Sequence, residues 1–83
     1  MANPEEVKAV IRSFLVEILA LEPGTLEDDT PLVSSRVVDS ITALKLVTYL
    51  EQKFGIEFAA LDLNPNTLET INSMTAYVQS RLK

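Results

Sequence analysis

The sequence predicts an all-α fold: a small antiparallel bundle of three main helices plus one short helix, with a long loop between the first two main helices. Apolar residues recur at three- and four-residue spacing in three segments, as on one face of a helix. Each segment starts next to a residue that can cap a helix. No pair of alternating segments is present to form a sheet. We expect the 83 residues to form a single domain, residues 1–83.

The first helix is expected over residues 4–20. Asn3 can cap it, Pro4 suits the first helical position, and Glu6 stands three residues after the cap. Pro23-Gly24 is expected to close the segment. The predicted core face consists of Val7, Val10, Ile11, Phe14, Leu15 and Ile18.

A long loop, residues 21–38, follows without a regular period. Loops of this length in small domains tend to be functional or disordered. Three spaced apolar residues, Leu26, Leu32 and Val33, are expected to anchor this loop to the helices, which argues against disorder. The acidic run Glu27-Asp28-Asp29 is predicted to lie on its outer side, in contact with solvent.

The second helix is expected over residues 41–54. Gly55 can take the left-handed conformation that ends a helix. Either Asp39 or Ser40 can cap the N-terminus by accepting backbone N–H bonds, so a hydroxyl stands where the helix begins. The predicted core face consists of Ile41, Leu44, Val47, Leu50 and Phe54, with Ala43 and Leu46 widening it.

A connector is expected after the second helix, because the alternating Ile56 and Phe58 are too few to form a sheet but can attach the chain to the core. Asn64-Pro65 repeats the pattern of a cap followed by proline. It predicts a short helix over residues 65–69, with Leu68 buried.

The last helix is expected over residues 71–82, with Thr70 as its cap. Arg81 and Lys83 place positive charge at its C-terminus, which suits the helix dipole. Its predicted core face consists of Ile71, Met74, Val78 and Leu82, with Tyr77 alongside.

The composition limits the classes of partner. Seven cations against twelve anions give a net charge of −5, which argues against binding to nucleic acid or to an anionic membrane surface. The charge favours partners with basic patches, unless it serves only solubility. The N-terminus lacks the basic region of a signal peptide, and the most apolar run, residues 14–21, is too short to span a bilayer. We expect a cytoplasmic monomer without a membrane span.

Catalysis by the chain itself is not expected. The sequence has no Cys and no His, so the candidate bases for a seryl nucleophile are Lys45, Lys53 or a carboxylate such as Asp39. A bundle of this size is also expected to leave little room for a substrate pocket. No metal site is expected, because the acids are scattered and lack the spacing of a calcium loop.

Two uses of Ser40 remain open at this point. Another enzyme can modify a serine at a helix N-terminus with a phosphate-linked group, whose anion the free N–H groups and the helix dipole favour. The missing His and Cys are then no obstacle. The alternative is an unmodified helical protein–protein interaction module in which Ser40 is only a helix cap.

The motif Asp39-Ser40-Ile41 resembles the signature of the acyl carrier protein family. It is preceded by Thr30-Pro31-Leu32 and followed by an amphipathic helix that ends in Lys53-Phe54-Gly55-Ile56, and the resemblance covers essentially the whole chain. It implies that Ser40 carries 4′-phosphopantetheine, transferred from coenzyme A by a phosphopantetheinyl transferase. The thiol of this arm would hold an acyl or aminoacyl group as a thioester, and the protein itself would be a non-catalytic carrier.

The resemblance also implies the partners and the surface that they recognise. The partners are the transferase, an acyl- or aminoacyl-loading enzyme, and a downstream synthase or transferase. The residues expected to contact them lie at and after the motif: Asp39, Ile41, Thr42, Lys45 and Thr48. In some relatives, the core face of this helix shelters the acyl chain.

Two departures from the family pattern concern pathway. Thr42 and Lys45 stand where carriers of fatty acid biosynthesis commonly have acids, and Glu51 is the only acid between residues 41 and 54. The stretch over residues 56–70 is longer than in typical fatty acid carriers and looks more like that of peptidyl or D-alanyl carriers. We therefore expect a specialised lipid, polyketide or nonribosomal peptide pathway. A third departure is Arg36, four residues before the serine, where related carriers often have glycine.

Overall fold

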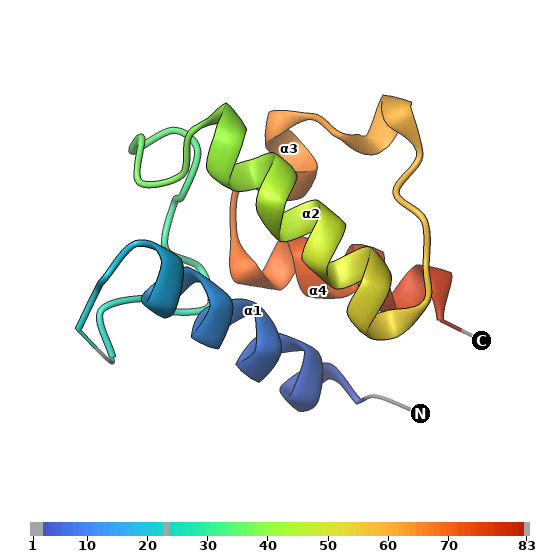
Figure 1. Cartoon of the computed structure of the whole chain (residues 1–83), viewed down its shortest axis with the longest axis horizontal. Helices are drawn as coiled ribbons and strands as arrows, with labels where there is room; N and C mark the ends of the chain where they lie inside the picture. Colours follow the sequence, from blue (N-terminus) through green and yellow to red (C-terminus); the bar gives the residue numbers. More distant parts are fainter. Residues whose placement is uncertain (1–2, 23, 83) are drawn as a thin grey trace.

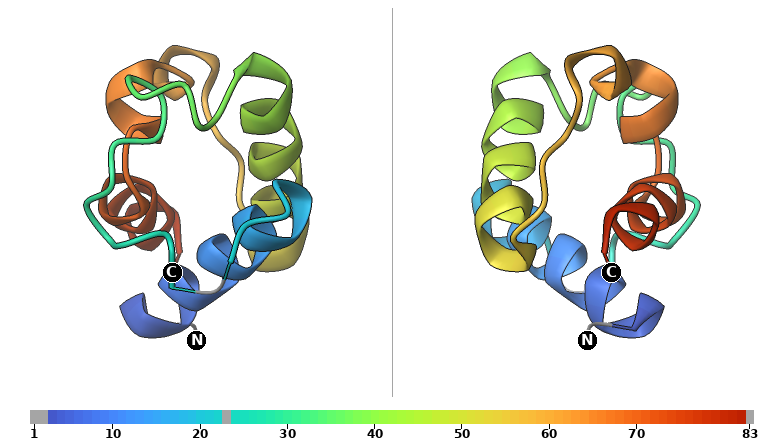
Figure 2. Two further views of the ribbon diagram at one scale, coloured as in Figure 1. Left: turned by 90° about the vertical axis from the view of Figure 1, so that its left-hand side faces the viewer. Right: turned by 90° about the vertical axis from the view of Figure 1, so that its right-hand side faces the viewer.

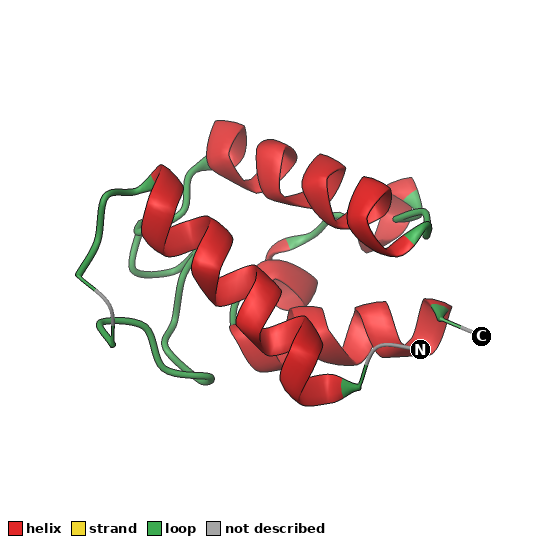
Figure 3. Cartoon of the chain, turned by 60° about the horizontal axis from the view of Figure 1, so that its bottom comes forward, coloured by secondary structure: helices red, strands yellow, loops and turns green. Residues whose placement is uncertain are grey.

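The structure is a computed structural model that describes residues 3–22 and 24–82. Its helices are α1 (Pro4–Ile18), α2 (Ser40–Phe54), α3 (Pro65–Leu68) and α4 (Ile71–Arg81), with one 3₁₀ turn, η1 (Ala60–Asp62). No strand occurs within the two described ranges (Figure 3). The predicted all-α fold, with three main helices, one short helix and a long first loop, is confirmed. Both α2 and α4 run opposite to α1 (Figure 1).

The core lies between the three long helices. Seen from the two sides of the view in Figure 1, α2 and α4 stand on either side of the molecule, with α1 at the base and α3 near the top (Figure 2). The connections also contribute apolar side chains, as predicted for Leu26, Leu32, Ile56 and Phe58. The buried hydrophobic residues of the helices are Val7, Ile11, Leu15, Leu46, Val47, Leu50, Ile71, Met74 and Val78. The predicted core faces of α1 and α4 are thus confirmed at their centres.

The outer members of the predicted core faces are less buried. Ile18 is 37% exposed, because it is the last residue of α1. Val10, Phe14 and Leu82 are half-buried against the core. The prediction missed Thr75, which is only 4% exposed and whose hydroxyl has no hydrogen-bond partner among the described residues.

The predicted core face of α2 is wrong in its first two turns. Ile41 and Leu44 are 65% and 60% exposed, whereas Leu46 is fully buried. At 3.6 residues per turn, a step of three residues falls about 60° short of a full turn. The series 41, 44, 47 and 50 therefore travels about 180° around the helix and cannot all face one core. The side that α2 buries is centred on Leu46, Val47 and Leu50.

The predicted helix ends are confirmed at most positions. The side chains of Asn3, Asn64 and Thr70 each accept the backbone N–H three residues further on, at 2.8–3.0 Å. Gly55 ends α2 with φ at 66°, in the left-handed region. Two residues that were predicted to mark helix ends lie outside the described ranges: Pro23 and Lys83.

The end of α1 differs from the prediction, because the helix stops at Ile18 rather than near residue 20. Ala20 takes a left-handed φ of 54°. Its N–H donates to the carbonyl of Glu17 at 3.3 Å, and the N–H of Leu21 donates to that of Val16 at 2.9 Å. These are the two hydrogen bonds of a Schellman motif, in which glycine usually occupies the left-handed position.

The acidic run of the long loop is only partly solvated, which corrects the prediction for its middle residue. Glu27 and Asp29 are exposed, but the Asp28 carboxylate pairs with Lys8 Nζ at 3.2 Å and with the Arg12 guanidinium. Hydrogen bonds and charge from Lys8 and Arg12 hold the pKa of Asp28 below its usual value. The prediction took the run as a whole, whereas the loop turns this one side chain towards two cations of α1.

The last part of the loop is held by Glu69, at the junction of α3 and α4. The N–H of Leu32 donates to the Glu69 carbonyl at 2.7 Å, and those of Val33 and Ser34 donate to the Glu69 carboxylate, each at 2.9 Å. The hydrogen bonds from Ser34 are the main cause that holds the pKa of Glu69 below its usual value of 4.5. The N–H of Val38 then donates to Leu32 O at 3.0 Å, so the tie extends to the start of α2.

Replacing Ala20 by glycine is expected to stabilise the protein. The Ala20 Cβ is strained in the left-handed region by about 1–2 kcal/mol, and the greater entropy of glycine in the unfolded chain offsets part of that gain. We expect Ala20→Gly to raise the free energy of unfolding in urea by roughly 0.5–1 kcal/mol. The matched control is Ala9→Gly, inside α1 and exposed, which should lower it by about 1 kcal/mol. Equal losses of unfolding free energy for both variants would contradict the interpretation that Ala20 is strained at the end of α1.

Removing the charge of Glu69 is expected to destabilise the fold in a pH-dependent way. A carboxylate with a lowered pKa stabilises the native state fully above its usual value of 4.5, and this contribution is lost as the pH falls through the lowered native value. Glu69→Gln should therefore melt below the wild type at pH 7, and the difference should shrink below about pH 4.5. Glu57→Gln, at an exposed position, should show little difference at either pH. A Glu69→Gln deficit that is independent of pH would contradict the ionic role.

Candidate functional site

The hydroxyl of Ser40 is free because its neighbour caps the helix. Asp39 is the N-cap of α2: its carboxylate accepts the N–H of Thr42 at 2.8 Å, and its carbonyl accepts that of Ala43 at 2.9 Å. Ser40 is the first residue of the helix and is exposed. Its hydroxyl makes no hydrogen bond within the described part of the chain. The alternative in which Ser40 is only a cap is therefore wrong about the residue that does the capping.

The groups near Ser40 do not form a catalytic set. Hydrogen bonds from Thr42, its backbone N–H first, hold the pKa of Asp39 below its usual value. A carboxylate with a lowered pKa is a weaker base towards a neighbouring hydroxyl. Lys45 borders a different hollow, and Lys53 lies thirteen residues along α2, roughly 20 Å away at 1.5 Å per residue. The described residues also contain no cluster of three metal-ligating side chains.

The turn that leads into α2 contains a strained residue. Arg36 has a left-handed φ of 65°, and its N–H donates to the carbonyl of Val33 at 3.0 Å. The Ser35 hydroxyl donates to the carbonyl of Pro31 within the same turn. This conformation gives a physical reason for the glycine that related carriers often have at the position of Arg36, because glycine adopts it without a Cβ clash.

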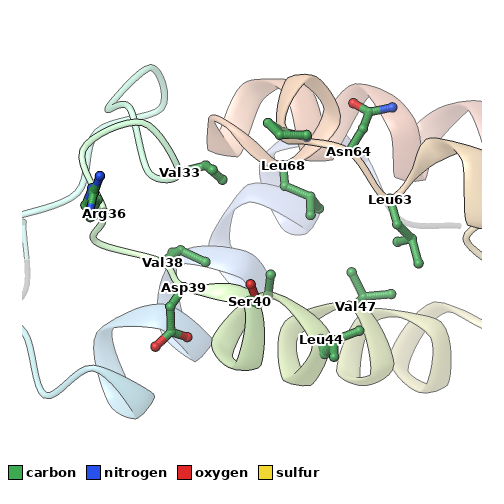
Figure 4. A pocket seen from close by; sticks show the side chains of 12 residues that line it. Val33, Arg36, Val38, Asp39, Ser40, Leu44, Val47, Leu63, Asn64 and Leu68 are labelled. Carbon is green, nitrogen blue, oxygen red and sulfur yellow. The ribbon is translucent and has the colours of Figure 1, made fainter.

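An open cavity of about 590 Å³ lies beside Ser40, between α2 and α3. Seen from close by, Ser40 and the first two turns of α2 form one side of it, and Leu68 and Leu63 stand across from them (Figure 4). Most of the lining is apolar. Leu68, predicted to be buried, and Val33, predicted to anchor the loop, are both half-buried and line this opening. The expectation that the bundle leaves little room for a pocket is also wrong.

The five residues predicted to contact partners lie on the first three turns of α2 and at its cap. Ile41, Lys45 and Thr48 are exposed, as is Asp39, whereas Thr42 is half-buried. The prediction missed Leu44, which is exposed and lines the cavity one turn after Ser40. The angular drift of a three-residue series would have shown that residues 41, 44, 47 and 50 cannot all be buried, although not which of them are exposed.

The only acid of α2 is turned towards the protein itself. The Glu51 carboxylate accepts the N–H of Phe58 at 2.8 Å and so holds the connector that follows the helix. Further along this connector, the Ala59 N–H donates to the Tyr77 hydroxyl at 3.1 Å, and that hydroxyl donates to Asp62 at 2.9 Å. The exposed side of α2 therefore presents no carboxylate after its cap.

Within the described ranges, every helix is too short or too polar to cross a membrane.

Residues 9–78 match the family model described as "Phosphopantetheine attachment site". The chain is 31% identical over 75 residues to an acyl carrier protein of Campylobacter hominis, which covers 90% of this chain and 92% of that protein. It is 32% identical over 74 residues to the probable acyl carrier protein PigG of a Serratia species, covering 89% of this chain and 84% of that protein.

A third relative is the meromycolate extension acyl carrier protein of Mycolicibacterium smegmatis, 26% identical over 78 residues, with 94% of this chain and 77% of that protein covered. The family match spans most of the chain, and it includes α2 and α3, which line a cavity beside an unbonded seryl hydroxyl. This chain therefore belongs to the acyl carrier protein family, whose members carry their cargo on a covalently attached 4′-phosphopantetheine arm.

Proposed function

We propose that the 4′-phosphopantetheine arm is attached to Ser40, and that the protein carries an acyl or aminoacyl group there and presents it to partner enzymes. The observation that carries this proposal is the division of roles at the start of α2. Asp39 accepts the capping hydrogen bond, and the Ser40 hydroxyl is left exposed and unbonded among the described residues. A hydroxyl committed to the helix cap would have to break that bond before modification.

The other serines of the chain are less suitable acceptors. The hydroxyls of Ser35, Ser73 and Ser80 donate to backbone carbonyls, and Ser34 lies in the loop, held to Glu69 through its backbone N–H, away from any helix N-terminus. Ser13 is exposed but lies in the middle of α1, where the backbone N–H groups are already bonded within the helix. Ser40 alone combines a free hydroxyl with a helix N-terminus.

The residues around Ser40 suit a phosphate-linked group. The N-terminus of α2 offers free N–H groups and the positive end of the helix dipole to a phosphodiester anion. Asp39 accepts the N–H of Thr42. When bound, the arm supplies a thiol that holds the cargo as a thioester, which accounts for a carrier without cysteine. A reduced, cytoplasmic setting is part of this proposal, because that thiol must stay free.

The chemistry is proposed to belong to the partners, so this chain is a non-catalytic carrier. A phosphopantetheinyl transferase supplies the arm from coenzyme A, a loading enzyme adds the cargo, and a downstream synthase or transferase takes it. The lowered pKa of Asp39 supports this division, since Thr42 hydrogen bonds leave that carboxylate a poor base. The partner-recognition residues of the proposal are those exposed at the start of α2: Asp39, Ile41, Lys45 and Thr48, with Thr42 at their edge.

The cavity and the surface of α2 bear on cargo and pathway. An apolar lining beside Ser40 supports an acyl cargo over a charged aminoacyl one, because a charged group would lose hydration there. The relatives include both plain acyl carrier proteins and a meromycolate extension carrier, so family membership fits either kind of pathway. The absence of outward acids on α2 supports a dedicated pathway over bulk fatty acid synthesis.

The first test is attachment of the arm. Incubated with coenzyme A and a broad-specificity phosphopantetheinyl transferase, the wild type should gain the mass of one arm, read by intact-protein mass spectrometry. Ser40→Ala should gain nothing, and Ser35→Ala, as the matched control, should gain the same mass as the wild type. A gain that survives in Ser40→Ala would move the site, and no gain on folded wild type would reject the proposal.

The second test separates the cap from the attachment point. Because Asp39 caps α2, Ser40→Ala should change the free energy of unfolding by less than about 0.5 kcal/mol. Asp39→Ala should lower it clearly in the same urea titration, because the N–H of Thr42 loses its partner. If Ser40→Ala were the more destabilising variant, the result would support the alternative of an interaction module in which Ser40 caps the helix.

A further inference from the structure

A second hollow, of about 460 Å³, lies between α1 and the outward side of α2. We call it the α1–α2 groove; it is lined by Phe14 and Ile18 of α1 and by Leu44, Lys45, Thr48, Tyr49 and Gln52 of α2. The ring of Tyr49 stacks on that of Phe14, with their centroids 4.8 Å apart. This contact holds the tyrosine against α1, so one wall of the groove is formed without a partner.

Exposed apolar side chains gather at this groove. The large hydrophobic residues that remain exposed include Ile18, Leu44 and Tyr49, which line it, and Ile41, which lies one turn before Lys45 on the same side of α2. Apolar groups grouped on a surface, rather than scattered, mark a site for another molecule. In contrast, Leu61 is 90% exposed on η1 and does not line the groove.

The charge at the groove is opposite in sign to that of the whole protein. Residues 30–56 contain three cations and two acids, while the chain carries −5. The described cations outside this stretch are held in ion pairs, namely those of Lys8, Arg12 and Arg81. Lys45 is in no ion pair of the described residues, and no acid lines the groove. A partner at this surface therefore meets an unneutralised ammonium group beside apolar side chains.

The groove adjoins the site of the proposed arm. Leu44 lines both the cavity beside Ser40 and the α1–α2 groove, so the two openings share a wall. An enzyme that acts on a group attached at Ser40 has to approach the first turns of α2. Its contact surface then extends naturally over Leu44 and Lys45.

We propose that the α1–α2 groove is the docking site of the enzyme that loads the arm, and that this enzyme presents an apolar side chain flanked by a carboxylate. The apolar side chain enters between Ile18, Leu44 and Tyr49, and the carboxylate pairs with Lys45. The proposal rests on attachment of the arm at Ser40. In this proposal the carrier supplies the positive charge and the enzyme the negative one. This is the reverse of a contact between a basic enzyme surface and an acidic carrier helix, and the net charge of the chain gives no indication of it.

The experiment uses the full chain, first armed with the purified transferase and checked by intact mass. Each armed variant is then incubated with clarified extract of the organism that makes it, and the rate at which cargo mass appears on the arm is measured. Lys45→Glu and Thr48→Glu, which place an acid opposite the expected carboxylate, should slow loading by about tenfold or more. Ile18→Ser should slow it less. The controls Lys53→Glu and Leu61→Ser, outside the groove, should load within about twofold of wild type.

Ionic strength supplies a second readout. Raising added salt from about 50 to 300 mM should slow loading of the wild type and should leave Lys45→Gln nearly unaffected, because only the former retains the charge pair. If every variant carries the arm but the groove substitutions do not change the loading rate, the docking proposal is overturned. The proposed function is then left intact. Faster loading of Lys45→Glu would also overturn the docking proposal, since the partner would then be basic. If wild type forms dimers in sedimentation that Ile18→Ser abolishes, the groove is a self-contact and the proposal fails.

Discussion

The hydrogen bonds to Glu69 are the interaction on which the rest of the site depends. They clamp Leu32, Val33 and Ser34 to the junction of α3 and α4, although these residues are separated by more than thirty positions. The bond from Val38 to Leu32 passes this restraint to the residue before the α2 cap. A long loop without regular structure would otherwise leave the start of α2 unplaced, because its conformational freedom grows with its length. The loop thereby contributes Val33 and Val38 to the cavity wall.

A division of roles between two neighbouring residues follows from that placement. The clamped loop brings Asp39 into extended backbone, with φ at −95° and ψ at −178°, which is the geometry of a capping residue. Ser40 then falls at the first helical position, where a side chain points outward and has no backbone group to satisfy. The free hydroxyl is thus a consequence of where the helix begins, and the proposed attachment chemistry needs no further arrangement by the carrier.

The second helix, α2, has three sides that face different surroundings. Leu46, Val47 and Leu50 face the core, the side of Ser40 and Leu44 faces the cavity, and the side of Lys45 and Thr48 faces solvent beside α1. The carboxylate of its single acid after the cap, Glu51, accepts a hydrogen bond from the connector. The helix can therefore combine a buried face for stability with two exposed sides of different chemistry, and the docking proposal assigns a separate use to each.

The sequence by itself determined where the helices lie and how most of them begin and end, because caps such as Asn3, Thr70 and Gly55 act on groups only three or four residues away. The family resemblance likewise followed from local motifs around Ser40. Only the tertiary structure decided which side of α2 is covered, that Asp39 rather than Ser40 caps it, that Asp28 turns to α1, and that a cavity and a groove flank the helix. These features depend on which distant segments pack together, and residue spacing carries no record of that. The early stop of α1 at Ala20 belongs with them, since a left-handed alanine is strained and persists only where surrounding structure holds it.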